Sequence, residues 1–186
     1  KGQPIVTLAS RLLRDKGVHE FVNAAQIINR NIKIARFVLV GEPDLGNPAT
    51  ITEKELRHWE EEEVIEYWGY RDDIPKIFAS SYMVVLPSYR EGLPKVLIEA
   101  AACARAVITT DVPGCRDAIE QNITGILVPV RNPKALAIAI KDLIDNPVLC
   151  EKMSFAGRRL AERSFDVKKV IIKHMNIYDE LMQKCN

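Results

Sequence analysis

Short apolar runs rich in β-branched residues alternate with helical patterns along most of the chain. This alternation restricts the fold more than any other feature of the sequence. Six runs have the length of strands, at residues 5–9, 35–41, 64–68, 82–87, 106–110 and 125–129. Most are continuously apolar, as expected when both faces of a parallel sheet are covered. Helical patterns separate them at 18–29, 52–61, 73–80, 95–104 and 116–121. The sequence therefore predicts a doubly wound α/β fold with a six-stranded, parallel, Rossmann-like sheet and right-handed crossovers.

Composition and charge argue against several classes of function. Lys and Arg number 26 against 25 Asp and Glu, a formal net charge of +1, which gives no support for a nucleic-acid partner. No apolar run approaches the roughly 18 residues of a membrane span. Four cysteines lack C-x-x-C spacing and predict free thiols in a reducing compartment, with no metal site or disulfide framework. They are Cys103, Cys115, Cys150 and Cys185.

Polar segments follow five of the six predicted strands, where ligands bind in doubly wound sheets. These segments are residues 10–17, 41–44, 69–73, 88–92 and 110–114. Because the carboxyl ends of parallel strands share one edge of the sheet, we expect the segments to converge there. The sequence therefore predicts the functional site at this edge.

Two features of this edge favour an anionic ligand. Gly92-Leu-Pro-Lys95 predicts a helix start, with Pro94 at the first helical position and Gly92 allowing close approach of a ligand. Arg11 and Lys16 add two cations from the first loop. The ordinary alternatives are a simple helix start and solvated surface charges. Together these features predict a clamp for a diphosphate.

Two acids stand eight residues apart in Ser88-Tyr-Arg-Glu-Gly-Leu-Pro-Lys-Val-Leu-Ile-Glu99. Glu99 is the only charge between Val96 and Ala104, in a segment that predicts a buried helix, so it calls for a polar partner. The vicinal hydroxyls of a ribose would supply two donors; backbone N–H groups or Arg105 are the alternative. Glu91 is expected to be exposed in the turn, where it would contact sugar hydroxyls or stabilise the helix dipole.

These residues, followed by Val107-Ile-Thr-Thr-Asp-Val-Pro-Gly-Cys-Arg116, resemble the E-x7-E signature of family 4 of the retaining glycosyltransferases. The resemblance is to the carboxyl-terminal, donor-binding half of their two-domain GT-B fold. Residues 10–17 resemble the phosphate loop of that family, 68–71 its base-contacting loop, and 125–129 its last strand. The match extends from about residue 5 to residue 145.

The resemblance implies a role for each candidate residue. Arg11 and Lys16 would hold the diphosphate of a nucleotide sugar and, with Glu91, form the catalytic group. Gly92, Leu93, Pro94 and Lys95 would line the sugar and phosphates, and Glu99 would bind ribose. Tyr70 and Arg71 would lie beside the base. A Gly and a Pro common in the family are replaced by Ala104 and Ala106, and Gly41-Glu42 replaces a Gly-x-Gly.

The resemblance also implies an activity, partners and a domain organisation. We expect residues 1–163 to form the nucleotide-sugar domain and 164–186 a helix that crosses toward an absent amino-terminal domain. The activity would be transfer of a hexosyl or N-acetylhexosaminyl group, often from a UDP-sugar, without metal or other cofactor. The acceptor would be a glycan or a lipid-linked sugar in surface polysaccharide synthesis. We expect a cytoplasmic location, with peripheral association at the inner face of the membrane as one option, and no turnover without the other domain.

Two other functions are considered on this fold. A stand-alone regulatory module would bind a nucleotide at the same anion site without catalysis. A dinucleotide oxidoreductase is disfavoured because no G-x-G-x-x-G follows the first strand. An upstream Rossmann-like domain would favour the transferase over the regulatory module.

Overall fold

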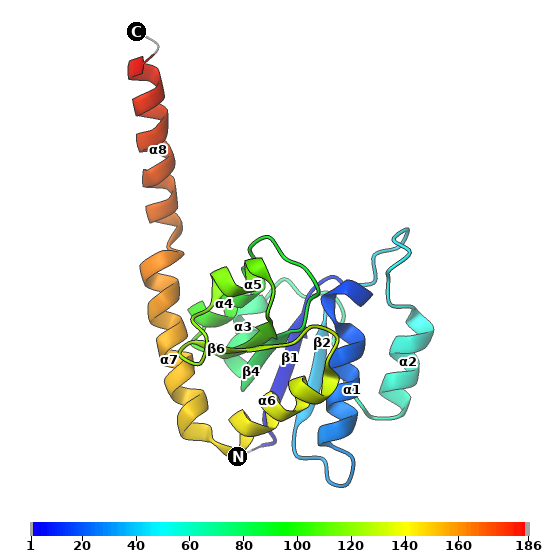
Figure 1. Ribbon diagram of the computed structural model, residues 1–186. Helices are drawn as coiled ribbons and strands as arrows, with labels where there is room; N and C mark the ends of the chain where they lie inside the picture. Colours follow the sequence, from blue (N-terminus) through cyan, green and yellow to red (C-terminus); the bar gives the residue numbers. More distant parts are fainter. Residues whose placement is uncertain (1, 185–186) are drawn as a thin grey trace.

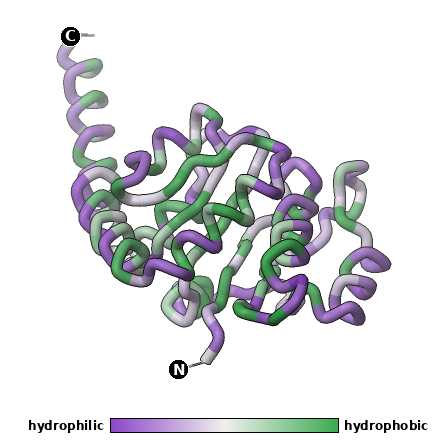
Figure 2. The backbone as a smooth tube through the Cα atoms, turned by 60° about the horizontal axis from the view of Figure 1, so that its bottom comes forward, coloured by the Kyte–Doolittle hydropathy of each residue, from purple (hydrophilic) through white to green (hydrophobic). Residues whose placement is uncertain are grey.

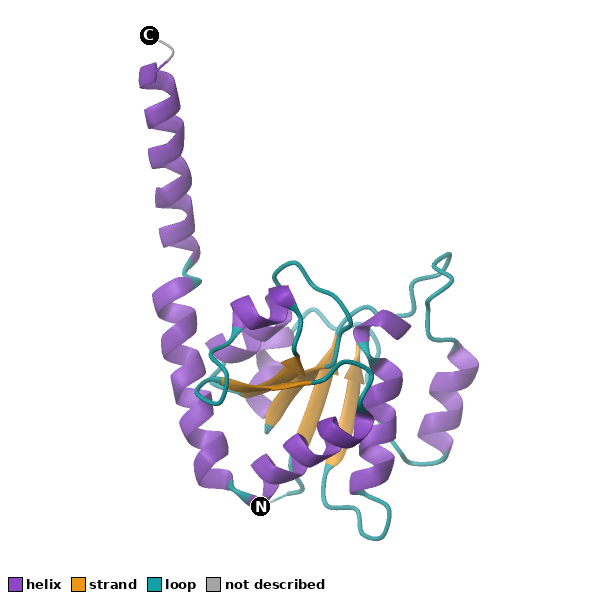
Figure 3. Cartoon of the chain, viewed as in Figure 1, coloured by secondary structure: helices purple, strands orange, loops and turns teal. Residues whose placement is uncertain are grey.

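A computed structural model describes residues 2–184 and confirms the predicted sheet (Figures 1 and 3). Its six strands are all parallel and lie in the order β3-β2-β1-β4-β5-β6. Their bounds are β1 Ile5–Ala9, β2 Arg36–Val40, β3 Glu66–Tyr67, β4 Met83–Leu86, β5 Ala106–Thr110 and β6 Gly125–Val128. Cys185, predicted to be a free thiol, lies outside the described residues. The other three cysteines are free, and two of them are buried.

Helices cover both faces of this sheet (Figure 1). Their bounds are η1 Arg14–Lys16, α1 Val18–Ile28, α2 Glu53–Glu61, α3 Ile74–Ser80, α4 Lys95–Ala102, α5 Pro113–Ala118, α6 Pro133–Asp145, α7 Pro147–Ser164 and α8 Val167–Lys184. Strand residues alternate between two apolar layers, as the pleat requires. Met83 and Val85 of β4 face the layer formed with α1 and α6, whereas Val84 and Leu86 face the layer formed with α3, α4 and α5. The continuous apolar runs of the sequence therefore reflect burial on both faces.

Three local predictions need correction. α5 begins at Pro113, three residues before the predicted start, because a proline at the first turn already has a helical φ angle. Pro94 was predicted at the first helical position of α4. It is instead the N-cap residue, and the first helical residue is Lys95. That helix ends at Ala102 rather than at residue 104, and Ala104 then takes a left-handed conformation with φ of 53°.

α8 differs from every other helix in its surroundings. α7 packs against α4 and β5, whereas α8 continues in nearly the same direction and leaves the body of the molecule (Figure 1). Hydrophobic and hydrophilic residues alternate along it (Figure 2). Its large apolar side chains are all exposed: Val167, Val170, Ile171, Ile172, Met175, Ile177, Tyr178, Leu181 and Met182. This helix, which was expected to cross toward another domain, therefore presents an apolar face without cover within residues 2–184.

Candidate ligand-binding site

The strand order places a switch point between β1 and β4. From β1 the chain turns to α1 on one face of the sheet, and from β4 it turns to α4 on the other face. The two loops diverge at the carboxyl ends of these neighbouring strands. A crevice at this point is where doubly wound folds bind ligands.

The β1 and β4 loops are locked together by close backbone contact. Gly17 has a φ of 75°, and a Cβ atom there would lie 2.1 Å from the carbonyl oxygen of Pro87. Only glycine fits this approach. The backbone N–H of Tyr89 donates to the carbonyl of Asp15 at 2.8 Å, and the Ser88 hydroxyl donates to the same carbonyl at 3.1 Å. The last part of the β1 loop is therefore held against the start of the β4 loop.

Tyr89 anchors the β4 loop to α1 as well. Its hydroxyl donates a hydrogen bond to Glu20 at 2.7 Å, and the guanidinium carbon of Arg131 lies 4.7 Å from the centre of its ring. Burial, together with the bond to the Glu20 carboxylate, raises the pKa of Tyr89 to about 12. The hydroxyl therefore stays protonated as a donor at neutral pH.

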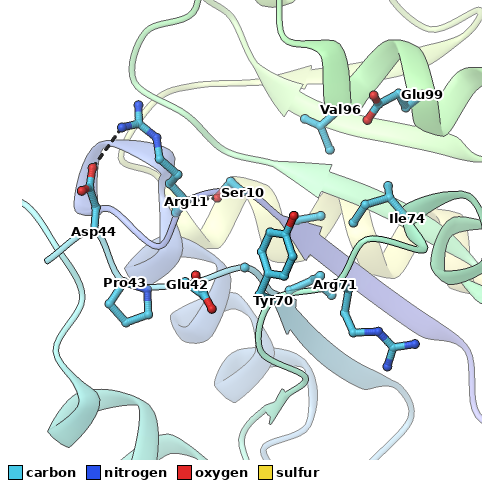
Figure 4. A pocket seen from close by; sticks show the side chains of 13 residues that line it. Ser10, Arg11, Glu42, Pro43, Asp44, Tyr70, Arg71, Ile74, Val96 and Glu99 are labelled. Atoms are coloured by element: carbon cyan, nitrogen blue, oxygen red, sulfur yellow. Dashed lines mark hydrogen bonds and ion pairs between the residues drawn. The ribbon is translucent and has the colours of Figure 1, made fainter.

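A cavity of about 440 Å³ opens at the carboxyl ends of β1 and β2 (Figure 4). Four of the predicted site residues line it: Arg11, Tyr70, Arg71 and Glu99. They come from the loops after β1 and β3 and from α4, so residues far apart in the sequence meet as predicted. Its volume is within the range of small-molecule sites.

Glu99 lies on the open side of α4, which corrects the sequence analysis. The expected surroundings were apolar and buried, yet the residue is exposed and lines the cavity beside Val96. Leu97, Ala100 and Ala101 form the buried face of the helix. Within residues 2–184 the Glu99 carboxylate makes no hydrogen bond or ion pair; Arg105 donates instead to the carbonyls of Ser81 and Cys103. The acid is thus free for a ligand, but burial does not force it to have one.

Glu91 and Lys16 form an ion pair with 2.6 Å between Nζ and Oε1. Their side chains are only 13% and 18% exposed, respectively, so the expectation of an exposed Glu91 is wrong. The cation of the β1 loop folds onto the acid of the β4 loop, which partly neutralises both. Neither residue lines the cavity of Figure 4.

Arg11 also has an acidic partner, on the loop after β2, which was expected at the same edge but without an ion pair to Arg11. Its Nη1 lies 2.9 Å from Oδ2 of Asp44, and Figure 4 shows the side chain turned toward that acid. The Arg11 side chain is 67% exposed and that of Asp44 33%. Each of the two predicted cations therefore meets one carboxylate, Arg11 that of Asp44 and Lys16 that of Glu91. The signal for Asp44 was its place after the second strand, at the predicted edge.

The loop from Gly92 to Lys95 lies beside the cavity rather than in its wall. Gly92, Leu93 and Lys95 are exposed and Pro94 is buried. This loop is fixed from the side by the start of α5, since a Cβ atom on Gly114 would lie 2.0 Å from the Gly92 carbonyl oxygen.

Tyr70 and Arg71 border the cavity from the β3 loop. Tyr70 is exposed, and its ring stands at the centre of the view in Figure 4. Arg71 makes a two-pronged ion pair with Asp73, with both N–O distances at 2.8 Å. Hydrogen bonding to Arg71 lowers the pKa of the Asp73 carboxyl below its ordinary value. The residue predicted to lie beside a base is therefore already oriented by its neighbour.

Two kinds of feature are absent from the described part of the chain. Residues 2–184 contain no cluster of three or more His, Cys, Asp or Glu side chains placed to hold a metal ion. None of the helices in the same part of the chain is both long enough and apolar enough to cross a membrane.

Comparison with known proteins connects the chain to a family. The family model described as glycosyl transferases group 1 matches residues 3–146. A curated relative from Campylobacter jejuni is 30% identical over 182 residues, which are 97% of this chain and 46% of the relative. It is N,N'-diacetylbacillosaminyl-diphospho-undecaprenol alpha-1,3-N-acetylgalactosaminyltransferase. The chain thus spans about half the length of the curated relatives it matches.

Solved structures share the fold over nearly the whole chain. Sucrose-phosphate synthase from Thermosynechococcus elongatus has a TM-score of 0.88 at 26% identity, covering 98% of this chain and 46% of that one. Anabaena Alr3699/HepE, solved in complex with UDP, has a TM-score of 0.87 at 22% identity, covering 96% and 49%. The latter likeness concerns the fold alone. These matches include most or all of α8, which lies outside the family model.

Proposed function

The chain belongs to the group 1 glycosyl transferases, and on that premise we propose that it is the donor-binding domain of a retaining, family 4 enzyme with a GT-B fold. The donor would be a nucleoside diphosphate sugar, and a UDP-sugar is the first candidate because a relative from Escherichia coli, 26% identical over 180 residues, is named for UDP-Gal. The transferred group would be a hexosyl or N-acetylhexosaminyl unit.

One observation carries the proposal: the cavity at the carboxyl ends of β1 and β2 brings Arg11, Tyr70 and Glu99 together from three separate segments. A free carboxylate can accept two hydrogen bonds from the vicinal hydroxyls of a ribose. The aromatic ring offers a surface for a base, and the arginine offers a charge for a phosphate. These are the three chemical parts of a nucleotide.

The reaction would place its developing charge on the departing diphosphate. Arg11, Lys16 and the N-terminus of α4 would stabilise this charge as the bond to the sugar breaks. Glu91 would bind hydroxyls of the donor sugar, and its contact with Lys16 would couple the sugar position to the phosphate position. Gly92, Leu93, Pro94 and Lys95 would border the sugar. We propose that this chemistry needs no metal or other cofactor.

The acceptor side would come from the other half of the protein. The chain spans 46% of its Campylobacter jejuni relative, whose name includes a diphospho-undecaprenol acceptor. We propose a lipid-linked or glycan acceptor in surface polysaccharide synthesis, bound at the membrane surface between two domains. Residues 1–163 would form the donor domain, and the helix within 164–186 would pack its exposed apolar face against the missing half. The chain alone would bind the donor without turnover.

Calorimetric titration with UDP, GDP and their sugars tests the donor proposal. Arg11→Ala should weaken binding by about 1–3 kcal/mol, as for a lost charge-assisted hydrogen bond. Arg57→Ala is the matched control, because Arg57 is 69% exposed and 67% of Arg11 is exposed, but Arg57 does not line the cavity. Equal affinities for the two variants would remove Arg11 from the site.

A ribose analogue tests the role of Glu99. Glu99→Gln should weaken UDP binding and have a smaller effect on 2′-deoxy-UDP, which has one hydroxyl fewer to offer the carboxylate. An equal loss for both ligands would contradict the ribose assignment. Circular dichroism should show an unchanged fold, since the residue is exposed.

A further inference from the structure

The walls of the cavity carry more acids than bases, although its proposed ligand is an anion. Glu42, Asp44 and Glu99 line it together with only two cations, Arg11 and Arg71. Both cations are paired with aspartates, Arg11 with Asp44 and Arg71 with Asp73. A polyanion entering this space would therefore meet cations that are already neutralised in part. Of the two aspartates, only Asp44 itself lines the cavity.

Hydrogen bonds to the backbone of its loop fix the position of Asp44. Its own N–H donates to the Thr50 hydroxyl at 2.8 Å. Three backbone hydrogen bonds join the loop that carries it to the β1 loop. They run from Leu12 N–H to the Glu42 carbonyl at 2.9 Å, from Arg14 N–H to the Ala49 carbonyl at 2.8 Å, and from Ile51 N–H to the Leu12 carbonyl at 2.8 Å. These bonds present the carboxylate to Arg11.

The two ion pairs of the site differ in how easily they can exchange partners. Lys16 and Glu91 are 18% and 13% exposed, and separating them would leave a largely buried charge without a partner, which is costly. Arg11 and Asp44 are 67% and 33% exposed, so water can replace either partner at little cost. Arg11 can therefore move from its carboxylate to a phosphate while Lys16 stays paired.

We propose that Asp44 is an affinity- and specificity-determining residue, which holds Arg11 in the empty site and disfavours ligands in proportion to their negative charge. This inference rests on the proposed function. A free nucleoside diphosphate carries about one negative charge more at neutral pH than its sugar ester, because its terminal phosphate ionises a second time near pH 6. Asp44 would thus weaken binding of the diphosphate product more than binding of the donor, and this would favour product release.

Neutralising Asp44 without changing its shape tests the inference. We expect Asp44→Asn to tighten UDP binding about threefold to fivefold and UDP-glucose binding about twofold to threefold, in line with the strength of exposed ion pairs and the charges of the two ligands. The gain should vanish in the double variant Arg11→Ala/Asp44→Asn. Asp145→Asn is the control, because it changes the net charge equally. Asp145 ends α6, pairs with Lys141 and does not line the cavity.

Calorimetry with UDP, UDP-glucose and inorganic pyrophosphate separates the outcomes. Weaker or unchanged UDP binding by Asp44→Asn would overturn the inference, since Asp44 would then orient Arg11 or do nothing. Equal gains for UDP and UDP-glucose would overturn the specificity claim. If the unmodified chain binds neither nucleotide, the proposed function fails, and pyrophosphate decides the inference: a gain in Asp44→Asn that depends on Arg11 supports it, and no gain overturns it.

Discussion

Helices α1 and α8 share an apolar periodicity and have opposite surroundings. In α1, Phe21, Val22, Ala24 and Ala25 are buried against the sheet and α6. In α8, an apolar face of similar spacing lies exposed beyond the body of the molecule (Figure 1). An apolar stripe thus predicts that a helix face needs cover, and it does not say whether the same chain provides that cover.

The largest expected effect tests the covered helix. Phe21 is fully buried and packs edge-on against Phe37, with ring centroids 5.5 Å apart. Phe21→Ala should lower the free energy of unfolding by about 3–5 kcal/mol, because it removes a large buried side chain and leaves a cavity. Urea unfolding measures this. A loss below about 1 kcal/mol would mean that α1 is no better anchored than α8.

An intermediate effect sharpens the comparison by testing a polar contact of α1. Glu55 accepts hydrogen bonds from the Thr52 hydroxyl and backbone and lies 3.0 Å from the ring of His19 on α1. Burial alone would raise its pKa, but these bonds outweigh burial and lower the pKa of Glu55 to about 2. Because the pKa of Glu55 is lower in the folded than in the unfolded protein, the ionised carboxylate stabilises the fold at pH values above its unfolded-state pKa. This stabilisation is lost as the pH falls from about 4.5 toward 2.

Glu55→Gln should therefore cost about 1–2 kcal/mol at pH 7 and flatten the pH dependence of unfolding in that acid window. Glu53→Gln is the control, in the same first turn but 74% exposed. If both variants show the same acid unfolding profile, the link between α1 and α2 contributes nothing.

The smallest expected effect concerns the uncovered helix. Ile171→Ala in α8 should change the free energy of unfolding of this chain by no more than about 0.5 kcal/mol, because the side chain is 55% exposed. In a protein carrying both halves, the same substitution should cost about 1–3 kcal/mol if α8 packs against the other half. An equal small effect in both proteins would show that α8 is not the contact surface.

The sheet was predictable because burial on both faces leaves a simple trace in the sequence. Runs such as residues 82–87 are short, apolar at consecutive positions and contain β-branched residues, as is typical of a strand covered on both faces. Convergence of the polar loops also followed from the parallel order. It correctly placed Arg11, Tyr70 and Arg71 around one cavity.

The predictions failed where the outcome depends on a contact between residues distant in the sequence, or on which face of a helix a residue occupies. Glu99 was placed in a buried helix because its sequence neighbours are apolar, yet Leu97 and Ala101, four residues apart, mark the buried face and leave Glu99 on the other side. The partners of Lys16 and Arg11 are 75 and 33 residues away in the sequence. No local pattern reveals such pairs.

The contact between Gly114 and Gly92 has a consequence for protein engineering. Any side chain at position 114 would collide with the main chain of a neighbouring loop, and no rotamer change can relieve that. Libraries that diversify the rim of this scaffold should therefore keep position 114 invariant while varying exposed neighbours such as Leu93. Loop grafts taken from other doubly wound proteins would have to bring a glycine to the same place.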